Sequence, residues 1–268
     1  MDKNNKIGFI GMGNMGYAML KGLLQVKAAE DILFTDVNRA RCVDVTKETG
    51  VAYVESNPEC VNDVKYVVLA VKPQFYPEVL KSIKFALKSN HVVISIAPGI
   101  TIDSLKETLG EDKRIVRAMP NTPALLGQGM TGISYDAAEF DEEEIAMIDT
   151  FFSSFGKYEK VAENLMSAVV CASGSSPAYV YMFIEALADS AVKYGMPRDK
   201  AYQFVAQAVK GSAEMVLQTG QHPGKLKDDV CSPAGTTIAG VAALEENGFR
   251  NSIIKATDAC YRKCEHLD

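Results

Sequence analysis

The chain has 268 residues, of which 47% are hydrophobic and 23% are charged, a composition typical of a globular protein with one large or two modest domains. Its formal net charge of -6 and its lack of clustered Lys and Arg argue against nucleic-acid binding, because phosphate contacts need gathered positive charge. No apolar run approaches the roughly 20 residues of a membrane span, and the first residues lack a signal-like segment, so we expect a cytoplasmic protein without a membrane partner.

Short β-rich runs alternate with helical stretches through the first part of the chain. We expect strands at Lys6–Ile10, Ile32–Thr35, Tyr66–Val71 and Val92–Ile96. Helical patterns lie between them at Met15–Gln25, Arg39–Thr49 and Glu78–Lys88. Strands that are apolar on both faces and separated by helices predict an α/β fold with a parallel sheet covered on both sides.

Two later helices in this part have recognisable ends. Thr101 opens a short helix that Gly110 can close. The acidic run from Asp141 to Glu144 places negative charge at the start of another helix, which we expect to end before Gly156.

The pattern changes after residue 162, where helices follow one another at Pro177–Tyr194, Asp199–Thr219, Thr236–Glu246 and Arg250–Leu267. Asp199 is the expected N-cap of the second of these helices, and Gly220 and Gly248 stand where C-terminal glycines usually do. The sequence therefore predicts two domains, 1–162 and 163–268.

The stretch Ala178–Ile184 is apolar or aromatic on every side. A helix with no polar face must be buried all round, and a domain of about 100 residues can hardly bury it alone. We therefore expect this helix to pack against a second subunit.

Between the first strand and the first helix stands a glycine-rich turn, Gly11-Met12-Gly13-Asn14-Met15-Gly16. The first glycine allows the tight turn, the second lets the backbone approach a pyrophosphate, and the third allows close packing of helix on strand. A merely flexible loop is the alternative. Because a strand precedes the turn and a helix and second strand follow it, the sequence predicts a nicotinamide dinucleotide site.

The end of the second strand bears on the choice between NAD and NADP. Asp36 stands where an acid would bind the ribose 2′-hydroxyl and repel a 2′-phosphate. Asn38 and Arg39 follow at once, however, and Arg39 could pair with that phosphate. The residues leave the preference between NADPH and NADH open.

Two loops follow strand ends in the same domain. Lys72-Pro73 lies at the carboxyl end of its strand, where open α/β sheets bind ligands, although a solvated loop lysine is an equal alternative. The loop Ala118–Pro123 is stiffened by two prolines, and it could hold Asn121 against a flat ring or be only a rigid turn.

In the helical domain, Cys231–Ile238 combines small residues, hydroxyls and a helix start. Backbone N–H groups at such a start bind carboxylates well, whereas an ordinary Ser or Thr N-cap is the plain alternative. Ser173–Pro177 similarly opens the apolar helix, again with a cap as the alternative. Glu163 stands at the domain junction, where a lone carboxylate is usually solvated.

The six cysteines form no Cys-x-x-Cys pair, and we expect reduced thiols. Cys260 and Cys264 lie four residues apart with His266 nearby. Packing explains this spacing better than a metal site, because too few ligands are present. We therefore expect no metal.

Taken together, the motifs resemble those of the pyrroline-5-carboxylate reductases, and the likeness runs from end to end. It rests on six segments: Ile7–Gly16, Ala70–Pro73, Arg117–Pro123, Ser173–Tyr179, His222–Asp228 and Ser232–Ile238. Related dehydrogenases share only the first of these, so the combination is specific.

The resemblance implies an N-terminal Rossmann domain followed by an all-α domain that interlocks with its twin in a homodimer, with dimers often assembling into a decamer. It implies reduction of 1-pyrroline-5-carboxylate to L-proline by NADPH or NADH. Carried over by position, the cofactor contacts add Asn57, Ala70, Val71, Lys72 and Pro73 to the glycine turn. The implied substrate contacts are Glu163, Ser232, Gly235, Thr236 and Thr237.

Within this resemblance, Thr237 is the catalytic candidate. Its hydroxyl would hydrogen-bond the substrate's ring nitrogen, while backbone N–H groups of residues 235–237 hold the carboxylate. We expect no histidine to act as the general acid, and the proton could come from solvent or from a substrate that reacts as its iminium.

The sequence departs from the family pattern at four positions. Ala234 replaces a usual Gly, which matters only if that residue needs a positive φ. Pro98 replaces a common Ala, Asp229 stands where relatives have Asn or Met, and Asp36 where many have Ser or Thr.

Two rival functions deserve comparison. A 3-hydroxyacid dehydrogenase would need a Gly-x-x-x-Asn-x-x-Lys helix motif, which is missing from Gly174–Lys193. A dinucleotide sensor without catalysis would keep the glycine turn but have no use for the Ser232–Thr237 loop.

Overall fold

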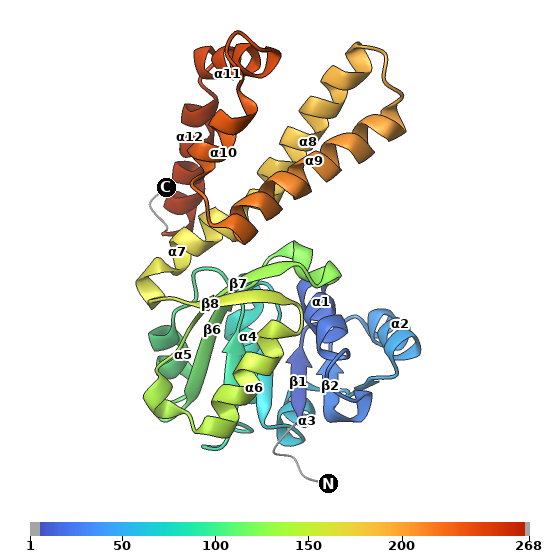
Figure 1. Ribbon diagram of the computed structural model, residues 1–268. Helices are drawn as coiled ribbons and strands as arrows, with labels where there is room; N and C mark the ends of the chain where they lie inside the picture. The colour runs from blue at the N-terminus through green and yellow to red at the C-terminus, as the bar shows by residue number, and fades with distance from the viewer. Residues whose placement is uncertain (1–5, 266–268) are drawn as a thin grey trace. The chain divides into compact units, whose positions relative to one another are not determined.

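A single mixed sheet forms the centre of the N-terminal unit in the computed structural model, which describes residues 6–265 (Figure 1). The strand order in this part of the chain is β3-β2-β1-β4-β5-β6-β7-β8. The strands are β1 (Ile7–Ile10), β2 (Ile32–Thr35), β3 (Ala52–Tyr53), β4 (Tyr66–Leu69), β5 (Val92–Ser95), β6 (Arg114–Met119), β7 (Gly129–Ser134) and β8 (Gly156–Lys160). The pairs from β3 to β6 are parallel, β6–β7 is antiparallel and β7–β8 is parallel.

The strand order reverses between β1 and β4. These two strands are paired in parallel, with Ile7 opposite Tyr66 and Ile10 opposite Leu69. β1, β4 and β5 are buried along their whole length, as the uninterrupted apolar runs predict. In open α/β sheets ligands bind beyond the carboxyl ends of the strands at such a reversal, so the fold itself points to the residues that follow β1 and β4.

Helices cover both faces of the sheet. α1 (Asn14–Leu23), α2 (Arg39–Thr49) and α6 (Glu142–Ser153) contribute to one apolar cluster, which contains Phe9, Phe34 and Phe151. The short helices α3 (Asn57–Asn62), α4 (Tyr76–Ile83) and α5 (Ile102–Leu109) contribute to a second cluster. The predicted α/β class is confirmed, and β2 and α2 have the bounds expected from the sequence.

The expected helix ends in this unit are also confirmed. Thr101 caps α5 through its side chain and Gly110 follows the last residue of that helix. Asp141 and Glu144 form a capping box at the start of α6, which ends before Gly156. The helix expected to run to Lys88, in contrast, ends at Ile83.

The sequence did not predict β3, β6, β7 or β8. β6 contains Arg114 and Arg117 and β8 is mostly polar, so neither has the apolar run that identifies a buried strand. β7 and β8 approach each other so closely that a Cβ on Gly156 would lie 2.1 Å from the carbonyl oxygen of Gly129. Gly156 is therefore required because any side chain at the start of β8 would collide with the backbone of β7.

The remaining helices form a second unit from Ser176 to Cys260. They are α8 (Ser176–Lys193), α9 (Arg198–Thr219), α10 (Pro223–Val230), α11 (Thr236–Glu246) and α12 (Phe249–Cys264), whose last turn from Tyr261 belongs to the first unit. The boundary expected at residue 162 follows the last strand, whereas the compact units divide between Ser175 and Ser176.

Three details of the helical part differ from the expectations. α8 begins at Ser176, inside Ser173–Pro177 as expected, but the unexpected α7 (Met166–Val169) and a π-helical turn (Val170–Gly174) lead directly into it. Pro197, and not Asp199, is the N-cap of α9. The short helix α10 was not expected, although Pro223 stands at its first turn, a position that proline favours. The C-terminal roles of Gly220 and Gly248 are confirmed by their left-handed conformations.

The helical unit has a small core of its own. Among its described residues, the buried apolar side chains are those of Ala188, Ala201 and Val205. The stretch Glu163–Lys193 is long and apolar enough to cross a membrane by length and composition alone, so the expectation that no run could do so was wrong on that criterion. Only 11% of its most apolar window is buried, so this helix presents apolar surface that the single chain leaves uncovered.

Glu144 provides a test of the sheet unit's stability. Its carboxylate is 1% exposed and forms ion pairs with Lys65, at 2.9 Å, and with Arg114. We expect Glu144→Gln to lower the free energy of unfolding by about 3 kcal/mol, because two poorly hydrated cations lose their partner. Urea denaturation of the intact protein measures this loss. Glu143→Gln on the exposed side of the same turn is the control, with an expected change below about 0.5 kcal/mol.

Candidate functional site

The glycine turn after β1 has the geometry that its spacing predicts. Gly11 has a φ of 100°, and a Cβ on it would lie 2.7 Å from the carbonyl oxygen of Ala70. A Cβ on Gly16 would lie 2.4 Å from the carbonyl oxygen of Gly11. A Cβ on Gly13, however, would meet nothing within 4 Å. Gly11 and Gly16 are thus required by the protein's own packing, while Gly13 borders open space that a ligand can approach.

The start of α1 leaves donors available in that space. Gly13 is its N-cap residue and makes no side-chain cap, so the first N–H groups of the helix, from Asn14 and Met15 onward, have no side-chain acceptor. Unsatisfied N–H groups and the helix dipole together bind phosphate well. This turn therefore fits the pyrophosphate of a dinucleotide on the evidence of its own geometry.

The other proposed cofactor residues lie at the same edge of the sheet. Ala70 donates its N–H to Ile10 at 2.8 Å, which holds residues 70 and 71 against the turn. Lys72 and Pro73 are exposed and begin a short 3-10 helix (Pro73–Phe75). Asn57 opens α3 after its cap Ser56 and donates from Nδ2 to Ser82 at 3.0 Å.

Asp36 is bound to the glycine turn itself. Its Oδ2 accepts from the Met12 N–H at 2.6 Å, and its Oδ1 accepts from the Asn38 N–H at 2.8 Å. Asn38 in turn caps α2. The carboxylate thus fixes the turn and places a negative charge beside it.

The two arginines of α2 face different neighbours. The Arg39 guanidinium pairs with the Glu55 carboxylate at 2.8 Å and also donates to the Val54 carbonyl oxygen. Arg41, which the sequence did not single out, donates from Nε to the Met12 carbonyl oxygen at 3.2 Å. No motif marks Arg41. Only its position in the first turn of a helix that begins three residues after Asp36 could have suggested it.

Asn121 is 8% exposed, and both ends of its amide are used inside the fold. Its Nδ2 donates to the Ser173 carbonyl oxygen at 3.0 Å, and its Oδ1 accepts from the Met130 N–H at 2.9 Å. Of the two alternatives for this loop, these contacts favour the rigid turn, since only the flat face of the amide remains for a ring.

Glu163 is not the solvated carboxylate expected at a junction. Its Oε1 accepts from the Ile102 N–H at 2.8 Å and from Nη1 of Arg117 at 2.9 Å. It lines a polar cavity of about 680 Å³ together with Arg117, Asp103, Ser167 and Tyr261. The residue belongs to the first unit, whereas the Ser232–Thr237 loop belongs to the second.

The loop before α11 is a tight turn. The Gly235 N–H donates to the Ser232 carbonyl oxygen at 3.0 Å, Pro233 occupies the second position, and Ala234 has a φ of 57°. These are the features of a type II turn, whose third position favours glycine. Ala234 is the one non-glycine residue with positive φ among residues 6–265. Ala234, the departure from the family's glycine, therefore stands at a position whose positive φ favours glycine.

The same loop leaves backbone donors without a side-chain cap. Gly235 is the N-cap of α11 and no side chain accepts from the first turn, so the ordinary Ser or Thr cap is wrong. Ser232, Thr236 and Thr237 are exposed. A Cβ on Gly235 would lie 2.4 Å from Oγ of Ser232, which can rotate away, and 3.1 Å from the Ser232 carbonyl oxygen, so a side chain there would fit tightly. Hydroxyls and free N–H groups at one helix start suit a carboxylate ligand.

Asp229 and Pro98, two of the departures from the family pattern, lie at the surface. Asp229 forms an exposed ion pair with Lys225, and Pro98 is exposed. Within residues 6–265 no cluster of three or more His, Cys, Asp or Glu side chains could hold a metal, and His266 lies outside the described residues. The six cysteines form no disulfide.

Comparison with known proteins identifies families whose sequences match this chain. Residues 163–267 match the family model of pyrroline-5-carboxylate reductase dimerisation, and residues 6–99 match that of the coenzyme F420-dependent NADP oxidoreductases. The pyrroline-5-carboxylate reductase of Escherichia coli strain K12 is 48% identical over 265 residues, 98% of each chain.

Solved structures agree with the sequence matches. The pyrroline carboxylate reductase of Plasmodium falciparum, crystallised with NADP bound, superposes with a TM-score of 0.88 at 33% identity, covering 100% of this chain and 99% of that one. The 1-pyrroline-5-carboxylate reductase of Streptococcus pyogenes gives 0.89 at 34% identity, covering 99% and 100%.

The strain at Ala234 can be measured directly. We expect Ala234→Gly to raise the free energy of unfolding by about 0.5–1 kcal/mol. Removing the Cβ relieves about 1–2 kcal/mol of strain in the left-handed conformation, and the greater conformational entropy that glycine gives the unfolded chain offsets only part of this gain. Ala239→Gly inside α11 is the matched control and should lower it by about 1 kcal/mol. Equal destabilisation of both variants in chemical denaturation would contradict the strain.

Proposed function

The chain belongs to the pyrroline-5-carboxylate reductase family, and we propose that it reduces 1-pyrroline-5-carboxylate to L-proline with NADPH or NADH. The observation that supports this most is a pair of helix starts without side-chain caps, α1 behind the glycine turn and α11 behind the Ser232–Gly235 turn. One suits the pyrophosphate of a dinucleotide and the other the carboxylate of a small substrate.

The reduction needs a hydride on the carbon of the C=N bond and a proton on its nitrogen. The nicotinamide supplies the hydride when it is bound, so the protein's task is to position the reactants and shape the field around them. N–H groups of Thr236 and Thr237 bind the carboxylate beside Gly235, whose own N–H closes the turn on Ser232, and the Thr237 hydroxyl hydrogen-bonds the ring nitrogen. Ser232 adds a second hydroxyl, and Glu163 contributes from the polar cavity that it lines.

Neither of the described histidines is suited to supply the proton. His91 is 4% exposed, its Nε2 lies 3.1 Å from the Val61 carbonyl oxygen, and burial lowers its pKa below the usual range. His222 caps α10 by accepting the Gly224 N–H at 3.0 Å. The proton therefore comes from solvent, or the substrate reacts as its iminium.

The cofactor is held at the carboxyl edge of the sheet. The Gly11–Gly16 turn binds the pyrophosphate, with Asn57 and the loop from Ala70 to Pro73 around it, and the flat face of the Asn121 amide packs against a ring of the cofactor. Asp36, Asn38 and Arg39 border the ribose in this proposal. The enzyme works in the cytoplasm, where the six cysteines stay reduced.

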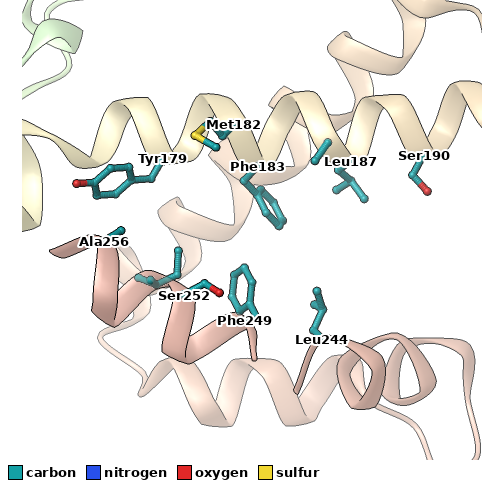
Figure 2. Close-up of a pocket in the computed structure, with 11 residues that line it drawn as sticks. Tyr179, Met182, Phe183, Leu187, Ser190, Leu244, Phe249, Ser252 and Ala256 are labelled. Carbon is teal, nitrogen blue, oxygen red and sulfur yellow. The ribbon is translucent and has the colours of Figure 1, made fainter. Parts of the chain in front are cut away.

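The assembly is a homodimer built through the helical unit, with a decamer of five dimers as its larger form. α8 exposes Tyr181 and Met182, at 59% and 68%, and an apolar cavity of about 570 Å³ lies between α8, α11 and α12. Figure 2 shows Phe183 and Leu187 of α8 pointing toward Leu244 and Phe249 across this cavity. A second copy would cover both the helix face and the groove.

Thr237 tests the catalytic part of the proposal. Thr237→Ala removes the hydroxyl beside the ring nitrogen, so we expect kcat/KM for 1-pyrroline-5-carboxylate to fall about tenfold or more while the Kd of the cofactor stays unchanged. Thr237→Ser keeps a hydroxyl and should retain most of the rate.

An unchanged kcat/KM in Thr237→Ala would refute that role. Proline formation by the wild type separates the proposal from both rivals, since a sensor would bind a dinucleotide without turnover and a 3-hydroxyacid dehydrogenase would oxidise hydroxy acids instead.

Met182 tests the dimer. A glutamate at this exposed position would bring a charge into an apolar interface, so we expect Met182→Glu to weaken self-association by about 100-fold in sedimentation velocity. Phe85→Glu is the control, because Phe85 is 94% exposed on the sheet unit and lies outside the proposed interface. Loss of association in both variants, or in neither, would contradict this surface.

A further inference from the structure

Asp36 and Arg41 lie on opposite sides of one residue of the glycine turn. The Met12 N–H donates to Oδ2 of Asp36 at 2.6 Å, and the Met12 carbonyl oxygen accepts from Nε of Arg41 at 3.2 Å. A carboxylate and a guanidinium thus hold the same residue between them. Met12 itself is fully buried, and both charges lie beside the turn that contains it.

The Arg41 side chain is held in place by α1. Its guanidinium carbon lies 4.5 Å from the centre of the Tyr17 ring, a cation–π distance. The Tyr17 hydroxyl donates to the Glu48 carboxylate, and Lys21 lies 3.8 Å from the same carboxylate. Burial and Glu48 raise the pKa of Tyr17, which keeps the hydroxyl protonated as the donor. The stack and the Met12 bond fix the plane of the guanidinium.

The terminal nitrogens of Arg41 remain available. Within residues 6–265 only Nε has a hydrogen-bond acceptor, and the side chain is partly exposed. The guanidinium therefore keeps its two Nη groups for a ligand, a fork that matches the oxygens of a phosphate. Arg39 differs, because its Nη atoms already bind Glu55 and Val54.

We infer that the Arg41 guanidinium binds the 2′-phosphate of NADP at this site and offsets the repulsion from the Asp36 carboxylate. This inference rests on the proposed function. Both oxygens of Asp36 accept backbone N–H groups, which offsets part of its charge while the Arg41 guanidinium supplies the positive partner. The site accepts both cofactors for this reason, and Arg41 sets the ratio between them. Arg39 fastens α2 to the Glu55 loop instead.

Calorimetric titration of NADP⁺ and NAD⁺ into the intact protein tests the inference without turnover. We expect Arg41→Gln to weaken NADP⁺ about tenfold or more and NAD⁺ less than about threefold. Lys47→Gln, at an exposed position further along the same helix, is the matched control and should leave the ratio of the two Kd values unchanged, whereas Arg39→Gln should shift the ratio less than Arg41→Gln does. Arg41→Lys, which keeps the charge and loses the planar fork, should fall between wild type and Arg41→Gln.

The opposite shift is expected from Asp36. Asp36→Ser removes the repelling charge and should move the ratio toward NADP⁺ by about tenfold. An unchanged ratio in Arg41→Gln, an equal loss of both cofactors, or a larger shift in Arg39→Gln would overturn the inference. Failure of wild type to form proline would refute the proposed function alone, since the binding ratios need no substrate.

Discussion

The N–H groups at the start of α1 are left without a side-chain acceptor, and the arrangement of the N-terminal unit follows from that one requirement. Gly13 caps the helix without a side chain. The turn can be this bare only because Gly11 and Gly16 pack directly on backbone, at distances that no Cβ would tolerate. Ala70 and Asp36 then hold the turn from the two strands that flank β1. A phosphate would complete the donors that the fold leaves open.

α11 also begins without a side-chain cap, but the turn before it includes a strained residue. The turn before it uses Ala234 in the left-handed conformation, where glycine would be unstrained. The hydrogen bond from Gly235 to Ser232 and the fixed φ of Pro233 determine that geometry. The strained residue therefore lies in the proposed substrate loop, next to N–H groups that the helix leaves uncapped.

Elements with a strong local signal could be predicted from the sequence. β2, α2, and the caps at Thr101 and Asp141 follow from apolar runs and side-chain caps that lie within a few residues. β8 could not be predicted, because a polar edge strand is defined by its partner and not by its own residues. Arg41 was missed for a similar reason, since only the folded turn brings Met12 beside it. The glycine turn and the Ser232 loop were found because each motif encodes its own backbone geometry.

The proposed site residues are divided between the two units. The dinucleotide turn belongs to the first, and Thr237 to the second, while hydride transfer needs reacting atoms about 3–3.5 Å apart. The helical unit has few buried apolar side chains of its own, so its stability depends on covering the faces of α8 and the groove beside α12. Association stabilises a folded state by mass action, because the partner binds only the folded form. In the proposed dimer, α11 would carry both the Thr237 loop at its start and part of the apolar groove, through Leu244, so subunit pairing would act on the helix that begins at the proposed substrate loop.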